Sequence, residues 1–314
     1  MFLSERQIMS DRLSGISVFV TAVEAGSFAL AASRLHLSRS AVGKTIARLE
    51  QRLGVRLFHR TTRSQSLTDD GALFYERCLR ALEEIRGAET LLESGKRQVS
   101  GRLRVSMPVL FGRMCIAPLL TELTREHPGL ELELSFSDRV VDLIEDGFDM
   151  AIRNGTLANS SGLVARRIGD HRMALCASPA YLQRCGEPLS IEQLAQHEAV
   201  TYMRAGARRS WLVLDSDGKP QDVMPNNRLQ MDDLQAIADA ATAGFGIAWL
   251  PCWLVREQLL SGALVRLLRD RPGAAFEAHA VWPHTPHLPL KVRLAVDTLV
   301  NKLPASLALV EKAL

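Results

Sequence analysis

The period of the hydrophobic pattern changes at Gly101. Before this residue apolar side chains recur every three or four positions, as they do on amphipathic helices. After it, segments such as Leu130–Phe136 alternate apolar and polar residues, as strands do, and helical stretches separate them. The chain of 314 residues is also longer than most single domains. The sequence therefore predicts a mainly helical N-terminal domain followed by an α/β domain.

Three short helices are expected before residue 55. Gly26 ends the first, Ser27 caps the second, and Ser38 caps a third that Gly54 stops. A brief turn at residues 36–37 joins the second helix to the third. Two helices joined by so short a turn are typical of a helix-turn-helix.

The next segment predicts a small β-wing, because Val55–Arg60 and Gln65–Thr68 bracket a basic, hydroxyl-rich tip at Thr61–Ser64. Residues 36–63 carry seven basic side chains and a single acid, Glu50. Such an excess of positive charge is what a surface that binds a polyanion needs, although a solvated basic face has the same composition.

A long helix capped by Thr68 should follow. Its apolar residues are spaced as a heptad seam, which favours a dimerisation helix; the alternative is an amphipathic helix lying on its own domain. The seam residues are Phe74, Cys78, Ala81, Ile85, Ala88 and Leu92. The polar stretch Gly95–Ser100 then reads as a hinge.

Beyond the hinge, the pattern predicts a βαβαβ unit and a second set of strands and helices, as in a doubly wound sheet. The first unit comprises strands at 103–105, 130–136 and 149–153, with helices at 112–126 and 140–147. The second set comprises strands near 173–178, 199–203, 246–250 and 279–282, a helix at 232–242 and a C-terminal helix from Pro289.

Several functional classes are excluded. No run of about 18 apolar residues occurs, so no membrane-spanning helix is expected. The charged N-terminus lacks the apolar core of a secretory signal, which predicts a cytoplasmic protein. The five cysteines include no Cys-x-x-Cys pair, so we expect reduced thiols, no structural zinc and, as an alternative, a redox pair of Cys176 and Cys185.

Catalytic motifs are missing as well. The sequence has no His-Glu-x-x-His, no phosphate-binding glycine loop and no Gly-x-Ser-x-Gly, so we expect a protein that is not an enzyme and has no cofactor. His279, His284 and His287 lie close in sequence and could suggest a metal site. The prolines among them favour a solvated turn instead.

Residues 16–78 resemble the N-terminal domain of LysR-type transcriptional regulators. The matching positions are Phe19, Gly26–Phe28, Ala31–Ala32, Leu35, Ser38, Ala41–Val42, Ile46, Leu49–Glu50, Leu53–Gly54, Leu57–Phe58, Arg60, Leu67–Thr68 and Gly71. The stretches FDMAIRNG, ASPAYL, ATAGFGIAWLP and LPLKVRLAVDTLV look like the effector domain of the same family. The resemblance thus covers nearly the whole chain.

The resemblance implies an α+β winged helix-turn-helix at residues 10–68 and a linker and dimerisation helix at 69–98. An α/β effector-binding domain at 99–314 would follow, with two lobes like a type 2 periplasmic binding protein: lobe I at 101–168 and 273–304, lobe II at 169–272. Family members act as homodimers or homotetramers, bind double-stranded DNA near promoters at interrupted inverted repeats, and work with RNA polymerase. A small-molecule co-inducer in the interlobe cleft switches them.

The family's base-reading positions map to the start of the third helix, at Arg39, Ser40, Gly43 and Lys44. Arg39 stands where the family often has Gln, and it predicts a guanine contact; Gly43 stands where Ser is frequent, and it either allows close approach to the groove or reflects a tolerant position. Ser38 caps this helix, and the expected phosphate contacts are Thr45, Arg48, His59, Arg60, Thr61, Thr62 and Arg63. Arg60 could instead pair with Glu50.

The effector should bind at the carboxyl ends of strands. The candidates are Met107, Pro108, Val109, Leu110, Phe111, Ser137, Arg153, Asn154, Thr201, Tyr202, Met203, Gly244, Phe245 and Gly246. The first loop carries no hydroxyl from Pro108 to Phe111, unlike relatives that hold small acids there, which favours a bulkier or more apolar effector. The alternative for this loop is ordinary packing between lobes.

Two other functional classes share parts of this pattern. A solute-binding protein would have the same C-terminal architecture, but it needs export and has no use for a basic N-terminal domain. An enzyme would require ligand turnover without DNA binding.

Overall fold

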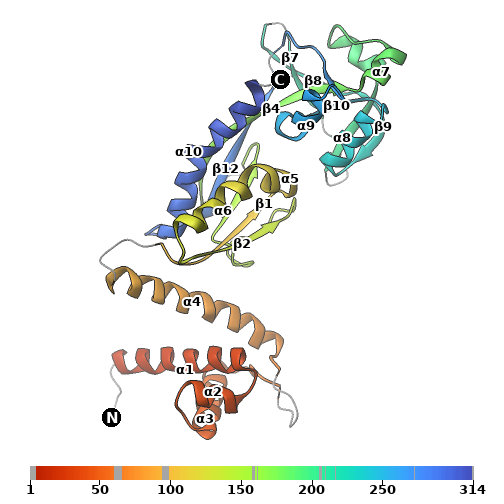
Figure 1. Ribbon diagram of the computed structural model, residues 1–314. Helices are drawn as coiled ribbons and strands as arrows, with labels where there is room; N and C mark the ends of the chain where they lie inside the picture. Colours follow the sequence, from red (N-terminus) through yellow and green to blue (C-terminus); the bar gives the residue numbers. More distant parts are fainter. Residues whose placement is uncertain are drawn as a thin grey trace. The chain divides into compact units, whose positions relative to one another are not determined.

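The computed structural model describes residues 5–59, 66–93, 99–157, 160, 162–204, 207–208, 210–215, 217–271 and 273–312. The chain divides into two compact units, Met1–Gly101 and Arg102–Leu314 (Figure 1). Among the described residues no single helix is long and apolar enough to span a bilayer. The bent pair Gly15–Ala25 and Phe28–Arg34 reaches that length and composition only when its two helices are taken together.

The first unit contains the helices that the sequence predicts: α1 (Glu5–Ala25), α2 (Phe28–Arg34), α3 (Arg39–Leu53) and α4 (Asp69–Glu93). The Ser27 hydroxyl accepts a hydrogen bond from the Leu30 amide, and the Ser38 hydroxyl accepts one from the Ala41 amide. Gly54 takes the left-handed conformation that ends α3, at φ 75°. These caps satisfy amide groups that a helix end otherwise leaves unpaired.

Aromatic rings hold this unit together. Phe19 of α1 is fully buried, and its ring centroid lies 5.5 Å from that of Phe58 and 5.4 Å from that of Phe74 on α4. Phe28 of α2 meets Phe58 edge-on at 5.3 Å. Because the rings come from three helices and the segment after α3, burying them fixes all four elements around one core.

In the second unit, ten of the described strands form one mixed sheet in the order β2-β1-β3-β12-β4-β10-β5-β6, with β9 paired to β5 and β11 to β4. The strands of this sheet are β1 (Gly101–Met107), β2 (Leu130–Phe136), β3 (Met150–Asn154), β4 (Leu163–Ala177), β5 (Glu198–Arg204), β6 (Ala207–Arg208), β9 (Asn226–Met231), β10 (Ile247–Pro251), β11 (Val265–Arg266) and β12 (Ala275–Pro283). A separate hairpin pairs β7 (Trp211–Leu214) with β8 (Pro220–Val223).

Helices cover this sheet. They are α5 (Val109–Phe111), the π-helical turn η1 (Gly112–Ile116), α6 (Ala117–Glu126), α7 (Pro179–Cys185), the 3-10 helix η2 (Glu192–Gln196), α8 (Leu234–Thr242), α9 (Cys252–Leu260) and α10 (Leu290–Lys312). The long helix α10 packs on β4 and contacts both α6 and α9.

Strand β4 belongs to both halves of the sheet. Its first part pairs with β12 as far as Arg172 opposite Ala275, and its last part pairs with β10 from Met173 onward. The chain returns through Gly273 and Ala274, and the Met173 amide donates a hydrogen bond of 3.0 Å to the Ala274 carbonyl. We call the half with β1, β2, β3 and β12 lobe I and the half with β5, β9 and β10 lobe II. The two chain connections between the lobes therefore lie side by side.

The predicted short helix at 140–147 is wrong, because this segment forms turns. The Asp142 carboxylate accepts hydrogen bonds from the Ile144 and Glu145 amides and so closes a single turn. Val140 stays 79% exposed and Ile144 56% exposed, whereas Leu143 is buried against Ala151 and Val281. A single turn is enough to bury this side chain. Two further elements are longer than predicted: β4 begins at Leu163, and the helix after β1 begins at Val109.

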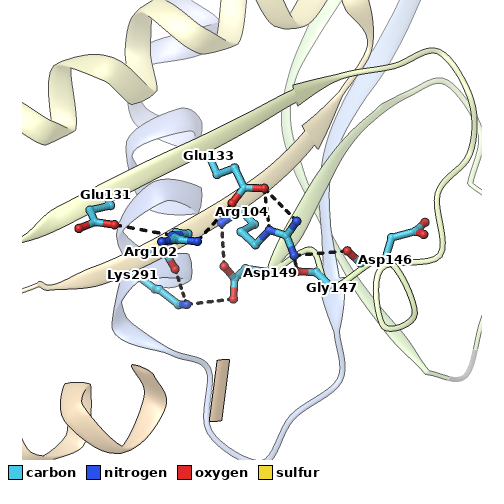
Figure 2. Close-up of polar contacts among 8 residues, drawn as sticks. All are labelled: Arg102, Arg104, Glu131, Glu133, Asp146, Gly147, Asp149 and Lys291. Carbon is cyan, nitrogen blue, oxygen red and sulfur yellow. Dashed lines mark hydrogen bonds and ion pairs between the residues drawn. The ribbon is translucent and has the colours of Figure 1, made fainter. Parts of the chain in front are cut away.

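An ion-pair network fixes the start of β1 (Figure 2). Arg104 donates to the Glu133 carboxylate on β2 at 2.9 Å, and its amide donates to the Asp149 carboxylate at 2.8 Å. Lys291, on the first turn of α10, pairs with Asp149 at 3.0 Å and donates to the Arg102 carbonyl at 2.6 Å. Only 11% of the Lys291 side chain is exposed, so its charge depends on these partners. The network joins three strand ends and one helix where the second unit begins.

Candidate functional site

Helix α3 presents a basic, solvent-facing surface. Its buried face consists of Val42, Ile46, Leu49 and Glu50, which pack into the first unit. On the opposite side Ser40, Lys44 and Arg48 are exposed, while Gly43 and Thr45 are half-buried; Arg39 is exposed at the first position of the helix. The residues predicted to read bases thus lie together on the N-terminal half of α3. The positive end of the helix dipole adds to their charge.

No contact with the residues that the structure describes explains Gly43. A Cβ atom built at this position meets nothing within 4 Å, and the backbone φ is not positive. Glycine in a helix interior costs about 1 kcal/mol relative to alanine. The first unit therefore loses stability here without any gain from its own packing.

The predicted wing is present at its base. Phe58 and Leu67 form an antiparallel bridge, and the His59 amide donates to the Ser66 carbonyl at 2.9 Å. His59 is exposed. The predicted phosphate contacts Arg60, Thr61, Thr62 and Arg63 lie outside the described residues.

Sequence reasoning missed the group that holds the wing in place. Glu50 is 8% exposed, and its carboxylate accepts hydrogen bonds from the Leu57 amide at 2.8 Å and the Phe58 amide at 3.3 Å. Its second oxygen lies 3.5 Å from the Arg56 guanidinium. The alternative pairing with Arg60 falls outside the described residues. The sequence did contain a signal for this role, because Glu50 is the single acid among the basic residues of positions 36–63.

The start of α4 is held against the segment Arg56–Phe58, which leads from α3 into the wing. The Thr68 hydroxyl caps the helix by accepting from the Gly71 amide at 2.9 Å, and it donates to the Arg56 carbonyl at 2.6 Å. A Cβ atom on Gly71 would lie 2.1 Å from the Leu57 carbonyl oxygen, so only glycine fits. The base of the wing, α3 and the start of α4 are consequently held together by direct contacts.

The predicted heptad seam divides along α4. Cys78 is buried in the first unit's core, and Phe74 packs against that core, so these two residues lie on their own domain. Ala81 and Ile85 are exposed, as is Leu73 at 57%. The side chains of Ala88 and Leu92 lie outside the described residues. Beyond Cys78, the seam side chains that the structure describes, Ala81 and Ile85, are therefore exposed.

In lobe I, the predicted effector loop follows β1 and meets the end of β2. The Ser137 amide donates to the Met107 carbonyl at 2.8 Å, and the Asp138 carboxylate accepts from the Val109 amide at 3.2 Å. Met107, Leu110 and Phe111 are buried, whereas Pro108 and Val109 are partly exposed. Gly112 is required here because a Cβ atom would lie 2.3 Å from the Met107 side chain.

Phe111 belongs to an aromatic cluster at the junction of the lobes. Its ring centroid lies 5.5 Å from that of His171 on β4 and 5.4 Å from that of Trp253 on α9. His171 also stacks on Phe276 of β12 at 6.0 Å, and Phe276 meets Trp249 of β10 edge-on at 5.6 Å. For Phe111, the structure shows the packing between lobes that the sequence left as the alternative.

Burial within this cluster lowers the pKa of His171 to about 4, against a smaller opposing effect of the Asp170 carboxylate. The imidazole is 5% exposed, and its Nδ1 has no hydrogen-bond partner among the described residues. His171 is therefore neutral at physiological pH.

The other predicted effector residues have mixed environments. At the end of β3, Arg153 donates to the Ile152 carbonyl at 3.0 Å, and the Asn154 side-chain oxygen is buried without a partner among the described residues. On β5, Thr201 is 4% exposed, whereas Tyr202 and Met203 are half-buried.

The predicted glycine loop lies before β10. Phe245 is 55% exposed, and the Gly244 carbonyl accepts from Arg184 at 2.9 Å. Gly246 has a packing role, because a Cβ atom would lie 2.5 Å from the Glu198 carbonyl oxygen.

The cysteines are free thiols. Cys176 is fully buried, with its sulfur 3.7 Å from the Ala248 carbonyl oxygen, and burial raises its pKa to about 12. Cys185 is exposed. Since the thiolate is the reactive form, the environment of Cys176 disfavours the redox pair.

The structure supports no metal site in the histidine loop. His279 lies 3.4 Å from a Glu277 carboxylate oxygen, while His284 and His287 are exposed. Across the described part of the chain, no group of three or more His, Cys, Asp or Glu side chains could hold a metal ion.

Comparison with known proteins covers both units. Residues 13–72 match the family model for the bacterial regulatory helix-turn-helix protein of the lysR family, and residues 96–304 match the LysR substrate binding domain. The chain is 36% identical over 289 residues to the HTH-type transcriptional regulator CrgA of Neisseria meningitidis serogroup C, covering 92% of this chain and 96% of CrgA.

Solved structures give the same result. The structure of CrgA, a LysR-type transcriptional regulator from Neisseria meningitidis, superposes with a TM-score of 0.57 at 34% identity and covers 92% of this chain and 98% of that one. Full-length AphB, a virulence activator of Vibrio cholerae, superposes with a TM-score of 0.57 at 28% identity, covering 93% and 99%. The chain belongs to the LysR family of transcriptional regulators.

Proposed function

We propose that this regulator binds a specific DNA sequence through α3 and that a small molecule bound between lobes I and II switches it. The exposed, basic N-terminal half of α3 carries the DNA-binding part of the proposal. In helix-turn-helix proteins the N-terminal residues of the second helix contact base edges in the major groove. The active form is a homodimer or homotetramer in the cytoplasm that works with RNA polymerase.

Arg39 and Gly43 are the proposed specificity residues of α3. Arg39 is exposed at the first helical position, and its guanidinium suits a bidentate contact with guanine O6 and N7. Gly43 has no packing reason to be glycine, so the missing side chain leaves room for close approach of the helix to DNA. Ser40 and Lys44 complete the base-reading face.

The proposed phosphate contacts surround this face. Thr45 and Arg48 lie further along α3, and His59 lies at the wing base. Arg60, Thr61, Thr62 and Arg63 belong to the proposal on sequence grounds. Such contacts position the protein without reading sequence.

The test is fluorescence anisotropy of the full chain with labelled DNA from its own upstream intergenic region, at several salt concentrations and against random competitor. We expect a competitor-resistant complex at least about 10³-fold tighter than non-specific binding. The Arg39→Ala variant should lose about 1–3 kcal/mol on the specific site and relax one base preference.

Arg48→Ala is the matched control from the same helix, and it should weaken all sequences alike and flatten the salt dependence by about one unit. An equal loss on specific and random DNA for Arg39→Ala would contradict the base contact. A footprint without two-fold symmetry would contradict the inverted repeat.

The co-inducer that we propose is bulkier or more apolar than a simple carboxylic acid. Support comes from the loop after β1, whose side chains from Pro108 to Phe111 carry no hydroxyl group. A thermal-shift screen should find stabilising ligands with an apolar body. If only small polar acids stabilise the protein, this part of the proposal is wrong.

A further inference from the structure

Lobe II contains a pocket away from the residues proposed for the interlobe site. It lies between the end of β4, strand β7 and the chain that returns to lobe I through Gly273 and Ala274. The pocket encloses about 310 Å³ including its open mouth. Little of this volume is deep, so most of a bound ligand would lie in the mouth.

The walls combine apolar side chains with positive charge. Leu212, Leu214 and Trp249 supply apolar surface, while Arg266 and Arg271 supply two guanidinium groups. Arg266 donates to the Arg271 carbonyl at 3.4 Å. The Nε of Arg271 is buried and has no hydrogen-bond partner among the described residues. A buried donor without an acceptor is costly, and it leaves part of the hydrogen-bonding capacity of the Arg271 guanidinium unused.

Two more features belong to the same wall. Leu268 has a left-handed backbone at φ 49°, a conformation that residues other than glycine rarely adopt. Strain of this kind is often retained where a site needs it. The exposed Glu192 carboxylate accepts a hydrogen bond from Ser190 and interacts electrostatically with Arg271.

We infer that this pocket binds a small carboxylic acid with an apolar body. The carboxylate would accept hydrogen bonds from Arg271 and Arg266, since guanidinium groups bind carboxylates in a planar, charge-assisted geometry. The body would lie over Leu212, Leu214 and Trp249. Because Gly273 and Ala274 form part of the wall, the ligand would contact the segment that connects the lobes. The pocket would then be a second ligand site, besides the interlobe site, that acts on the second unit.

The test uses benzoate as the probe and neutral benzamide as its control, with isothermal titration calorimetry and thermal shift on the full-length protein. Benzoate should bind and raise Tm, whereas benzamide should not. Arg271→Gln should weaken benzoate binding by about tenfold or more. Arg125→Gln is the control, because Arg125 is exposed on α6 and does not line the pocket.

Two further variants distinguish binding in this pocket from binding at the interlobe site and from loss of binding through misfolding. Leu214→Trp should block the mouth and abolish benzoate binding with the Tm of the free protein retained. Thr201→Val alters the proposed interlobe site and should leave benzoate binding unchanged. If Thr201→Val weakens binding and Arg271→Gln does not, benzoate occupies the interlobe site and the inference is wrong. A benzoate Kd weaker than about 10 mM would also overturn it.

Discussion

At the scale of single residues, Gly43 separates the stability of the protein from its proposed function. Gly43→Ala should stabilise the first unit by about 0.5–1 kcal/mol, because alanine favours the helix and its Cβ meets nothing. The same change should weaken specific DNA binding if the helix approaches the groove closely. Circular dichroism melting and anisotropy on one preparation measure both effects.

Gly15→Ala provides the control for this experiment. Gly15 also lies inside a helix, and an added Cβ would come no closer than 3.9 Å to Thr45. The variant should gain stability and keep its DNA affinity. Unchanged affinity in Gly43→Ala would identify residue 43 as a tolerant position.

His171 makes the stability of the second unit depend on pH. The folded pKa of about 4 lies below the usual value of 6.5, so between these values the unfolded chain binds a proton that the folded chain does not. The free energy of unfolding should therefore fall as the pH drops through this window, by about 2 kcal/mol between pH 7 and pH 5. Below about pH 4 this contribution should change no further.

Tryptophan fluorescence can follow this transition selectively, because all four tryptophans lie in the second unit. Urea unfolding of His171→Phe at the same pH values is the comparison. The variant should lose most of the pH dependence, and an identical dependence in both proteins would assign it to other groups.

At the scale of elements, Glu50 couples α3 to the wing. Glu50→Ala should destabilise the first unit by about 1–3 kcal/mol, because the Leu57 and Phe58 amides lose a buried acceptor. Glu50→Gln keeps an oxygen at this position and should lose less. Circular dichroism melting gives the stability, and equal losses in the two variants would contradict the role of the amide bonds.

The elements of the first unit follow closely from sequence, because each boundary has a local chemical signal. Ser27, Ser38 and Thr68 cap helices, and Gly54 ends one, all within a few bonds of their targets. No local sequence signal predicts that the Glu50 carboxylate accepts hydrogen bonds from the amides seven and eight residues later. That bond depends on how the chain folds back.

The second unit shows the same limit more clearly. The hydrophobic pattern located β2, β3 and β5, but it placed the start of β4 ten residues too late. The residues from Leu163 to Arg172 pair with β12, more than a hundred positions away in sequence, and half of them are polar. The helix expected at 140–147 does not form, although Leu143 packs against the core, because the Asp142 carboxylate binds the Ile144 and Glu145 amides in a single turn.

The candidate sites divide in the same way. The basic residues of α3 lie together because they are close in sequence on one helix. The pocket of lobe II, in contrast, forms only when Arg271 and β7, which are distant in sequence, come together in the folded domain. Sequence spacing carries no signal for such a meeting.

At the scale of the whole molecule, the exposed part of the α4 seam predicts self-association. Ile85→Glu should dissociate the proposed dimer, because it places a charge on the apolar face that begins at Ala81. Ala72→Glu, on the opposite side of α4, should leave the oligomeric state unchanged. Sedimentation velocity distinguishes the two, and a dimer that survives Ile85→Glu would place the interface elsewhere.

The paired connections between the lobes determine how the second unit can deform. Two adjacent strands tied by the bond between Met173 and Ala274 act as a flat ribbon, which bends readily across its plane and resists bending within it. A Cβ atom on Gly273 would lie 2.2 Å from the Met173 carbonyl oxygen, so the ribbon has no slack at this point. We therefore expect the lobes to move relative to one another most easily by swinging about this pair of connections, and such a swing would also have to shift the contacts of α9 with α10 and η1.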